Sequence, residues 1–574
     1  MKQAKNNKLI FNIFAITLLI LVGLSFVKSI FVSFDMDEGY ALSQGIRLAM
    51  GDHLFKEMWE PHQLSAYPIA ILAKIFLTIT GGSSTGIIIF LRVFGCLIHA
   101  GLGYLLYLAL KSYVSKNVSL ILSLIHCLYL PKWVQLPEFE LMQYWNLLLV
   151  FICLTTAYKK QKMKVAMLIL AGVFTLLQMT SYPTMCILFI PAIIAIRKNS
   201  FTKLKDCLIC SAGFFGSGIL VLIYIFAFIT PSEFMRNLKF IFMDESHTTE
   251  TGLSKLLLYK DQVLGSLLLN IVAIFVAFFI VAIIMCLIKR LDFNSYFKEI
   301  VLNSLITSCG LLLVADLVAV AFFDVNIFVF THFYISFIIL GIFLYFAYPN
   351  KRLGLPYISL FLSGILSVVA ISIMTNMSLN VIISHAFPSI LAVIIYLASI
   401  NNGKKTRKDY TKAFATFTVV ALILTLLFSR LIAIRVNGCL PVTIRAGLER
   451  MERGPLAGLY VVDDDAYIYN GLMDLVDEYE ASDRLLYIGG ETWIYSYKPS
   501  TVCSASVQGT SSYNEAFIEY YSFYDKLPAV VMYDTSLGEN PAYNTTTVND
   551  EMLEFIKNNY SNIEDKNFAI IYTP

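Results

Sequence analysis

The sequence predicts a polytopic α-helical membrane protein that ends in a small α/β domain. Of its 574 residues, 57% are hydrophobic and 14% are charged, whereas an average globular chain is about 25% charged. The mean hydropathy is +0.70. The apolar runs are too long for barrel strands, and only helices and closed barrels satisfy the backbone inside lipid. After about residue 435, charged residues interrupt the apolar pattern, which marks the start of a different domain.

Thirteen apolar runs have the length of a membrane span or slightly less. A short basic segment, residues 1–8, precedes the first of them. That run is longer than a signal-peptide core, and no convincing small-residue cleavage site follows it. We therefore expect an uncleaved first helix with its N-terminus in the cytoplasm. The thirteen runs lie near residues 9–34, 87–110, 117–131, 142–158, 164–181, 183–196, 206–229, 263–288, 299–322, 328–347, 356–375, 380–400 and 412–434.

A further apolar run, residues 64–80, is ambiguous. If it spanned the membrane, the lysines between residues 111 and 164 would move to the outer face, against the positive-inside rule. As an interfacial helix it leaves those lysines and the later basic loops in the cytoplasm. The rule then selects thirteen spans, a cytoplasmic N-terminus and an outer C-terminus, in a multi-pass protein of the plasma membrane. Because most loop acids then face outward, we expect any chemistry on the extracytoplasmic side.

The first outer loop, residues 35–86, is the most informative stretch. It opens with Asp35, Asp37 and Glu38, three carboxylates in four residues beside a membrane. Such a group is costly unless the acids are solvated, paired or used. The spacing after it predicts an amphipathic helix over residues 38–50, which ends at a glycine. With the run at 64–80, the loop would hold two interfacial helices, and its dense acids are more typical of a site than of a solvated turn.

Two other outer loops carry groups suited to the same site. Residues 131–141 hold Glu138 and Glu140, which are either site acids or solvated loop acids. Residues 230–262 hold Arg236 and Lys239, which suit either a phosphate or lipid headgroups. Shorter turns bring Tyr182, His332 and His385 to the same level, and for both histidines a structural hydrogen-bonding role is the main alternative.

The sequence predicts that the C-terminal region, residues 436–574, forms an α/β unit on the outer face. Four runs rich in β-formers alternate with helical patterns, which predicts a mainly parallel sheet. Cys439 and Cys503 both fall here, and a disulfide between them is possible if the region is extracytoplasmic. The β-rich runs lie near residues 458–463, 484–489, 529–534 and 568–573, and the helical patterns near 466–480, 513–523 and 547–560.

These residue types fit transfer of a sugar at a membrane surface. An outward site has no dependable supply of nucleotide sugars, so a donor carried by a lipid would suit it. A carboxylate would take the proton of an acceptor hydroxyl, basic groups would stabilise the departing phosphate, and aromatic rings would stack on sugar faces. A second acid would orient the acceptor or bind a divalent cation. We expect the bilayer itself, and no nucleic acid, as a further partner.

The first loop resembles that of the membrane-embedded GT-C glycosyltransferases. The resemblance is to the branch with protein O-mannosyltransferases, lipid A aminoarabinose transferases and bacterial dolichyl-phosphate-mannose-type sugar transferases. It departs from the family pattern at His62-Gln63, where members often have proline or glycine, and no phosphate-binding arginine aligns in the later loops. The matching residues are, in order, Asp37-Glu38, Tyr40, Gly51-Asp52, Pro61 to Leu64, Tyr67, Lys74 to Phe76, Gly81-Gly82 and Arg92.

The resemblance implies that residues 1–435 form a catalytic domain that uses a polyprenyl-phosphate sugar and inverts the anomeric carbon. The acceptor would be a glycan, a lipid or a protein. It implies Asp37 as catalytic carboxylate with Glu38 as its partner, and leaves dependence on Mg²⁺ or Mn²⁺ open, with Asp37 and Glu138 as possible ligands. The predicted substrate-binding residues are Asp35, Tyr40, His62, Tyr67, Glu138, Glu140, Arg236, Lys239 and His332.

Two other functions remain open on the sequence. One is a polysaccharide polymerase or ligase that uses glycans linked to a lipid diphosphate, which would favour a large basic outer loop; the third loop here is mixed in charge. The other is a transporter or flippase, which would need paired charges deep in the helical bundle, and few charges lie there.

Overall fold

The structure is a computed structural model of the chain. It confirms the predicted fold class, because helices dominate and a small sheet unit follows them. It describes residues 2–131, 135–199, 201–241, 252–288, 290–323, 331–375, 377–400, 408–436, 440–443, 447–481, 484–509, 514–524, 526–535 and 550–574.

The secondary structure follows in chain order. The α-helices are α1 (Lys2–Phe31), α2 (Met36–Met50), α3 (Tyr67–Ile79), α4 (Ile87–Leu110), α5 (Lys116–Leu128), α6 (Phe139–Lys159), α7 (Lys164–Met179), α8 (Phe189–Asn199), α9 (Lys203–Phe226), α10 (Pro231–Ile241), α11 (Gly252–Ala282), α12 (Phe293–Phe323), α13 (Thr331–Ala347), α14 (Gly354–Pro356), α15 (Ser363–Met374), α16 (Leu379–Ile382), α17 (Phe387–Ile400), α18 (Lys408–Leu431), α19 (Asp463–Glu478), α20 (Asn514–Phe523) and α21 (Asp550–Asn559). Tighter or wider helical turns are η1 (Gln63–Ala66), η3 (Gln161–Met163), η4 (Pro183–Leu188), η5 (Ile283–Ile288), η7 (Lys351–Leu353), η8 (Tyr357–Leu362), η9 (Ile383–Ala386) and η10 (Thr492–Ser496). The strands are β1 (Ala433–Val436), β2 (Leu440–Thr443), β3 (Leu448–Arg450), β4 (Tyr460–Val462), β5 (Leu485–Ile488), β6 (Val530–Asp534), β7 (Asn562–Asp565) and β8 (Ala569–Thr573).

The protein is a multi-pass membrane protein. Within the described residues, 10 helices are long and apolar enough to cross a membrane. Each of the thirteen predicted runs coincides with a helix or with a helical pair such as η4 and α8. Three of the runs give shorter helical segments, namely α5, η4 with α8, and α13.

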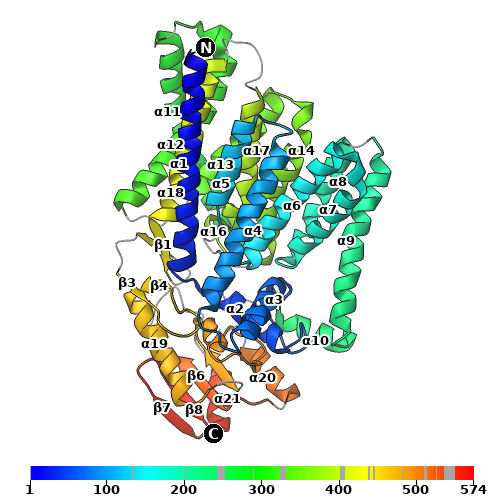
Figure 1. Ribbon diagram of the computed structural model, residues 1–574, viewed down its shortest axis with the longest axis vertical. Helices are drawn as coiled ribbons and strands as arrows, with labels where there is room; N and C mark the ends of the chain where they lie inside the picture. The colour runs from blue at the N-terminus through cyan, green and yellow to red at the C-terminus, as the bar shows by residue number, and fades with distance from the viewer. Residues whose placement is uncertain are drawn as a thin grey trace.

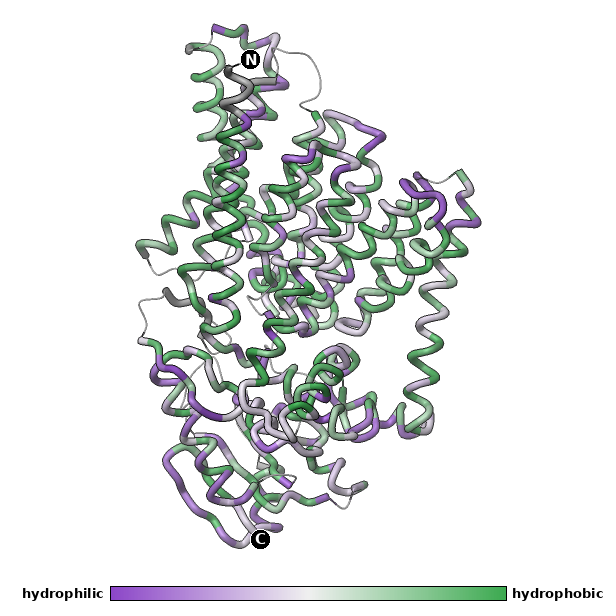
Figure 2. The backbone as a smooth tube through the Cα atoms, in the orientation of Figure 1, coloured by the Kyte–Doolittle hydropathy of each residue, from purple (hydrophilic) through white to green (hydrophobic). Residues whose placement is uncertain are grey.

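The helices form a bundle with the C-terminal unit at one end (Figure 1). The N-terminus lies at the opposite end, while α2, α3 and α10 lie beside the C-terminal unit. Hydrophobic residues dominate the bundle and hydrophilic residues gather at its two ends and in the C-terminal unit (Figure 2). The first outer loop is therefore held between the bundle and the C-terminal unit.

Helix α2 begins and ends as its sequence dictates. Asp35 and Glu38 form a capping box, in which each side chain accepts a backbone N–H at the start of the helix. At the other end Gly51 adopts φ 117°, a left-handed conformation that glycine tolerates best. Helix α3 packs closely on α2 at Gly45, where an added Cβ would come within 2.4 Å of the Ile69 side chain.

The C-terminal sheet is mixed, so the prediction of a mainly parallel sheet is wrong. Its order is β5-β6-β8-β7. Strands β5 and β6 are parallel, but β8 runs antiparallel to both of its neighbours. Only residues 566–568 separate β7 from β8, which is too short for the crossover that a parallel pair needs. Strand β4 pairs with β3 outside this sheet. Cys503 is buried in this unit, whereas Cys439 lies outside the described residues.

Candidate functional site

Asp37 lies in the first turn of α2, with its side chain half-buried. Its backbone N–H donates to the Asp35 carboxylate over 2.9 Å. Asp35 therefore acts as the cap of the helix, and its role is to fix the backbone that carries Asp37. Asp35 was predicted to bind substrate; in the structure its carboxylate positions the backbone of Asp37.

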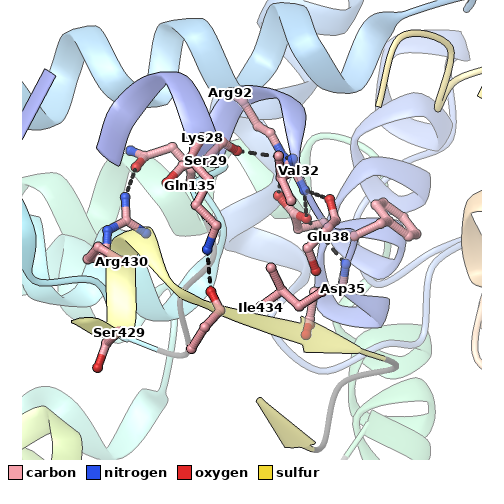
Figure 3. A pocket seen from close by; sticks show the side chains of 13 residues that line it. Lys28, Ser29, Val32, Asp35, Glu38, Arg92, Gln135, Ser429, Arg430 and Ile434 are labelled. Carbon is pink, nitrogen blue, oxygen red and sulfur yellow. Dashed lines mark hydrogen bonds and ion pairs between the residues drawn. The ribbon is translucent and has the colours of Figure 1, made fainter. Parts of the chain in front are cut away.

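Glu38 is held by Arg92, the arginine near the start of α4. Both carboxylate oxygens accept from the guanidinium, and the Arg92 Nε contact measures 2.9 Å (Figure 3). Arg92 also donates to the carbonyls of Ser29 and Ser33 at the end of α1, over 3.0 and 2.8 Å. Since the Glu38 carboxylate is buried and doubly bonded, its geometry suits orientation of the α2 N-terminus better than proton transfer.

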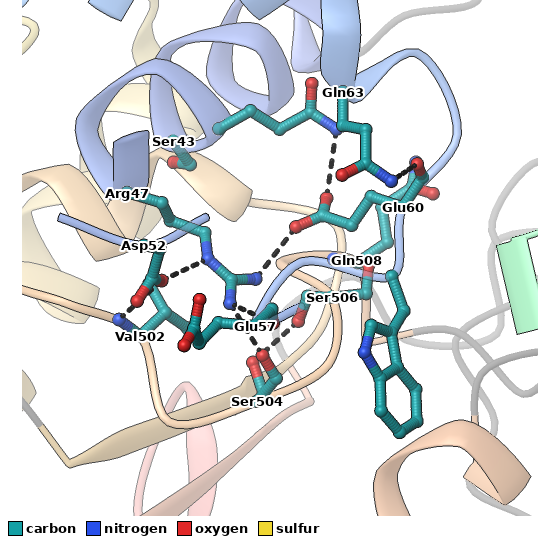
Figure 4. Close-up of polar contacts among 12 residues, drawn as sticks. Ser43, Arg47, Asp52, Glu57, Glu60, Gln63, Val502, Ser504, Ser506 and Gln508 are labelled. Atoms are coloured by element: carbon teal, nitrogen blue, oxygen red, sulfur yellow. Dashed lines mark hydrogen bonds and ion pairs between the residues drawn. The ribbon is translucent and has the colours of Figure 1, made fainter. Parts of the chain in front are cut away.

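The other end of α2 is tied to the C-terminal unit through Arg47, which is fully buried (Figure 4). Its guanidinium contacts Asp52 and Glu60, each over 2.8 Å. It also donates to the Ser504 carbonyl over 2.9 Å. Nearby, Ser43 donates to the Thr492 carbonyl over 2.6 Å. Both ends of α2 are therefore fixed, which leaves Asp37 little freedom to move.

The acids of the second loop lie beside Asp37. Glu138 caps α6, and its carboxylate accepts from the backbone N–H groups of Glu140 and Leu141 over 2.7 and 2.6 Å. Burial, the neighbouring Glu140 and the charge of Asp37 raise the pKa of Glu138 well above its usual value. The two acidic motifs lie about 100 residues apart in the sequence. The fold brings them close enough for the charge of Asp37 to act on Glu138.

Glu140 lies between an aromatic and an imidazole group. Tyr182 donates to its Oε1 over 3.3 Å, and His385 Nε2 lies 3.8 Å from its Oε2. The other ring nitrogen of His385 lies 3.2 Å from Gln143 Oε1. Tyr182, Gln143 and His385 were absent from the predicted site. Tyr182 and His385 had been noticed as polar turn residues, but no sequence signal joins them to Glu140.

His62 connects the first loop to this group. It has φ 59°, its ring stacks on Phe139 at 4.1 Å between centroids, and it meets Tyr182 edge to face at 4.8 Å. Its Nδ1 contacts the Ser181 carbonyl, so this nitrogen carries the proton. Tyr40 supports the same turn by donating to the Pro61 carbonyl over 2.8 Å.

His62 and Tyr182 also line a cavity of about 570 Å³ between α7, α9, α10 and the first loop. Its remaining walls are largely apolar. Helix α10 contributes Phe234, Leu238 and Ile241, which recur on one helical face. The cavity therefore ends at a polar wall, where Tyr182 contacts Glu140. The other lining residues are Phe55, Glu60, Pro61, Gln63, Leu64, Leu176, Met179, Thr180, Ser181, Pro183, Phe214, Phe215, Gly218, Ile219, Val221, Leu222, Ile225, Met374 and Thr375.

Arg236 and Lys239 were expected near the donor phosphate, but they lie on the opposite face of α10. The Arg236 guanidinium stacks on Phe523 at 3.7 Å, and Lys239 pairs with Glu515 over 3.0 Å. Both therefore join α10 to α20 of the C-terminal unit. This correction follows from helical periodicity, because the apolar face of α10 is the one that lines the cavity.

Tyr67 and His332 contact residues of neighbouring helices. Tyr67 packs edge to face against Tyr224 of α9, with 5.6 Å between centroids, and is absent from the cavity lining. His332, at the start of α13, contacts Asp316 of α12. Both residues therefore make contacts between helices, and their contact with substrate stays a prediction.

A divalent cation has no ready-made site among the described residues, since no three His, Cys, Asp or Glu side chains are grouped for one. Asp37, Glu138 and Glu140 supply the oxygen ligands that Mg²⁺ and Mn²⁺ prefer. In the described residues these three carboxylates are not grouped closely enough to hold a cation.

Comparisons with known proteins gave structural matches only. No family model matches the chain, and no curated protein matches it. It is similar to the crystal structure of the Archaeoglobus fulgidus oligosaccharyltransferase tethered to an acceptor peptide with the NVT sequon, with 11% identity over 98% of this chain and 74% of that one, at a TM-score of 0.47. It is also similar to the oligosaccharyltransferase AglB from Archaeoglobus fulgidus in complex with an inhibitory peptide and a dolichol-phosphate, with 10% identity, the same coverage and a TM-score of 0.44.

Proposed function

We propose that this protein is an integral-membrane glycosyltransferase that moves a sugar from a polyprenyl-phosphate to an acceptor on the extracytoplasmic face. The proposal rests on one observation: three acids and a large apolar cavity lie next to each other. Asp37, Glu138 and Glu140 gather at one end of the bundle. A largely apolar cavity of about 570 Å³ reaches the same group through His62 and Tyr182.

The cavity favours a donor carried by lipid. Its walls of α7, α9 and α10 suit isoprenoid units, because apolar surface gains free energy when it leaves water. The polar wall at His62 and Tyr182 would meet the sugar and phosphate.

In the proposed reaction, Asp37 acts as general base. It accepts the proton of the acceptor hydroxyl, and the hydroxyl oxygen attacks the anomeric carbon. The bond from that carbon to the phosphate oxygen breaks, and polyprenyl phosphate leaves with the bonding electrons. Attack from the face opposite the phosphate inverts the anomeric configuration. Asp35, Glu38 and Arg92 hold the backbone of Asp37, and Glu140 with Tyr182 orients the sugar or the acceptor.

The orientation in the membrane follows from charge. The loops at the N-terminal end of the bundle carry the lysines between residues 111 and 164, which the positive-inside rule assigns to the cytoplasm. The C-terminal unit and the acid group would then face outward, with the plasma membrane as the proposed location.

Replacement of Asp37 by asparagine tests the proposal. We expect Asp37→Asn to lower transfer at least about 100-fold, because it removes the base and keeps the side-chain volume. The assay follows radiolabelled sugar from polyprenyl-phosphate donors in membranes. Asp261→Asn is the matched control, since Asp261 is an acid of α11 with a side chain 70% exposed. Equal transfer by Asp37→Asn and wild type at equal expression would contradict the assignment.

A second donor class belongs in the same assay. If label moves only from polyprenyl-diphosphate oligosaccharides, the protein is a ligase or polymerase and the monophosphate donor is wrong. If neither donor is used and the lipid-linked sugar crosses the bilayer of liposomes that contain the protein, the protein is a flippase.

A further inference from the structure

A second, smaller pocket lies at the seam between α1, α18 and the segment that follows α5 (Figure 3). Its volume is about 40 Å³, enough for a small anion or a few waters. Lys28, Arg92, Gln135 and Arg430 supply its nitrogen donors. It shares no lining residue with the large apolar cavity, so it is a separate feature of the molecule.

Two donors in this pocket lack acceptors. Arg430 is 5% exposed and Gln135 is 1% exposed. Arg430 Nη2 donates to Gln135 Oε1 over 3.2 Å, but Arg430 Nε and Gln135 Nε2 are buried without a hydrogen-bond partner among the described residues. A buried N–H group without an acceptor is costly, above all on a guanidinium, so the arrangement indicates that something absent from the chain completes it.

The charges around the pocket leave a positive excess. Three cationic side chains, Lys28, Arg92 and Arg430, and two carboxylates, Asp35 and Glu38, line it, so one positive charge is in excess. Arg92 pairs with Glu38, and the Asp35 carboxylate caps α2. Lys28 and Arg430 are the other two cations, and Lys28 donates to the carbonyl of Ala433. Both cations lie in the last turns of α1 and α18, where the helix dipole favours positive charge. The dipole explains why cations are tolerated there, but it does not supply acceptors for the two unpartnered N–H groups.

We infer that this pocket binds an oxyanion of the phosphate class, held by Arg430, Lys28 and Gln135. Phosphate oxygens match the guanidinium fork and accept from amide and ammonium donors together. The end of α1 is also the level at which the chain leaves the bilayer, so the phosphate could belong to a lipid headgroup or be free. The site adjoins the cap of α2 and does not depend on the proposed sugar transfer.

Binding is tested on the full chain purified in a neutral detergent. One arm measures the thermal unfolding midpoint against inorganic phosphate, with potassium gluconate at equal ionic strength as reference. The other arm measures adducts of phosphatidic acid by native mass spectrometry. We expect a saturable rise in midpoint or a bound lipid, and the arm that responds identifies the source of the phosphate.

Three variants make the result specific. Arg430→Gln removes the charge, and Gln135→Glu places a carboxylate next to Arg430, so both should abolish phosphate or lipid binding. Gln135→Glu should also raise the midpoint without phosphate, which shows that it folds. Lys205→Met, at an exposed lysine near the start of α9, should bind as wild type does. No response in either arm, or a response that Gln135→Glu retains, would overturn the inference.

Discussion

At the scale of single residues, the Glu38 carboxylate joins parts of the chain that lie 54 residues apart. It completes the cap of α2 and pairs with Arg92, whose other donors bind backbone carbonyls at the end of α1. Three helices therefore meet at one ion pair. The position of Asp37, one residue earlier, depends on this junction.

We predict that Glu38→Gln lowers the free energy of unfolding by about 3 kcal/mol, because it leaves the Arg92 charge buried and unpaired. The measurement is reversible unfolding by SDS titration, followed by tryptophan fluorescence. Asp474→Asn is the control and should change little, since its side chain is 69% exposed. A Glu38→Gln protein that is as stable as wild type but inactive would instead assign Glu38 to the chemistry.

Protonation of Glu491 in the C-terminal unit makes the free energy of unfolding depend on pH. Burial and the charges of Asp465 and Asp534 raise its pKa from 4.5 to about 8. Since the folded state binds this proton more tightly than the unfolded state, its contribution to stability is present below pH 4.5 and is lost as pH rises toward 8.

We predict that Glu491→Gln removes this loss, with a gain of up to about 5 kcal/mol above pH 8 relative to wild type. The amide oxygen can still accept from Trp493 Nε1, which lies 2.8 Å from Glu491 Oε2. The measurement is thermal unfolding from pH 5 to pH 9. Parallel pH profiles for the two proteins would show that Glu491 is not the titrating group.

At the scale of elements, the contact between α2 and α3 depends on a small residue. At Gly45 an added Cβ would meet Ile69 Cγ2 at 2.4 Å and the Ala70 backbone nitrogen at 3.2 Å. Gly23 of α1 is a matched helical glycine with no atom within 4 Å of the same position. The two glycines therefore separate the effect of packing from the effect of helix propensity.

We predict that Gly45→Ala costs about 1–3 kcal/mol, because α3 must shift to admit the methyl group. Gly23→Ala should be neutral or stabilising, since alanine is the better helix former. The measurement is the thermal unfolding midpoint of each variant. Equal midpoints would mean that α2 and α3 separate without cost.

The elements themselves were largely predictable, and their boundaries follow local chemistry. The capping residues and Gly51 of α2 are visible in the sequence because each acts within a few residues of its own position. The sheet was predicted less well. Strand β7 carries Asn562, Glu564 and Asp565 and is exposed along its length, so it lacks the apolar alternation that marks a half-buried strand.

The candidate site was predictable only in part, for a similar reason. Asp37, Glu138 and Glu140 were recognised as acids in outer loops, and the fold brings them together. Their neighbours Tyr182 and His385 reach Glu140 from turns 42 and 245 residues later in the chain, and no periodicity encodes such pairs. The positions of Arg236 and Lys239 could not be predicted, because charge in a loop does not tell which face of α10 lines the cavity.

At the scale of the whole molecule, Arg47 is one of the residues that join the C-terminal unit to the membrane part. Its guanidinium binds Asp52 and Glu60 of the first loop and the Ser504 carbonyl of the C-terminal unit. Asp52 also accepts from the backbone N–H of Val502 over 3.4 Å. This buried cation thus links the two parts, together with contacts such as that of Ser43 with the Thr492 carbonyl.

We predict that Arg47→Met loosens the C-terminal unit, because it leaves two buried carboxylates without a counter-charge, at a cost of roughly 3–5 kcal/mol. Hydrogen exchange should rise in residues 44–60 and 502–508 and stay unchanged in α11 and α12. Arg453→Met is the control, since the ion pairs of Arg453 with Asp474 and Asp477 are partly exposed and lie within the C-terminal unit. If exchange in residues 502–508 rises no more in Arg47→Met than in Arg453→Met, the attachment rests on the other contacts of α2, such as Gly39 against Trp493.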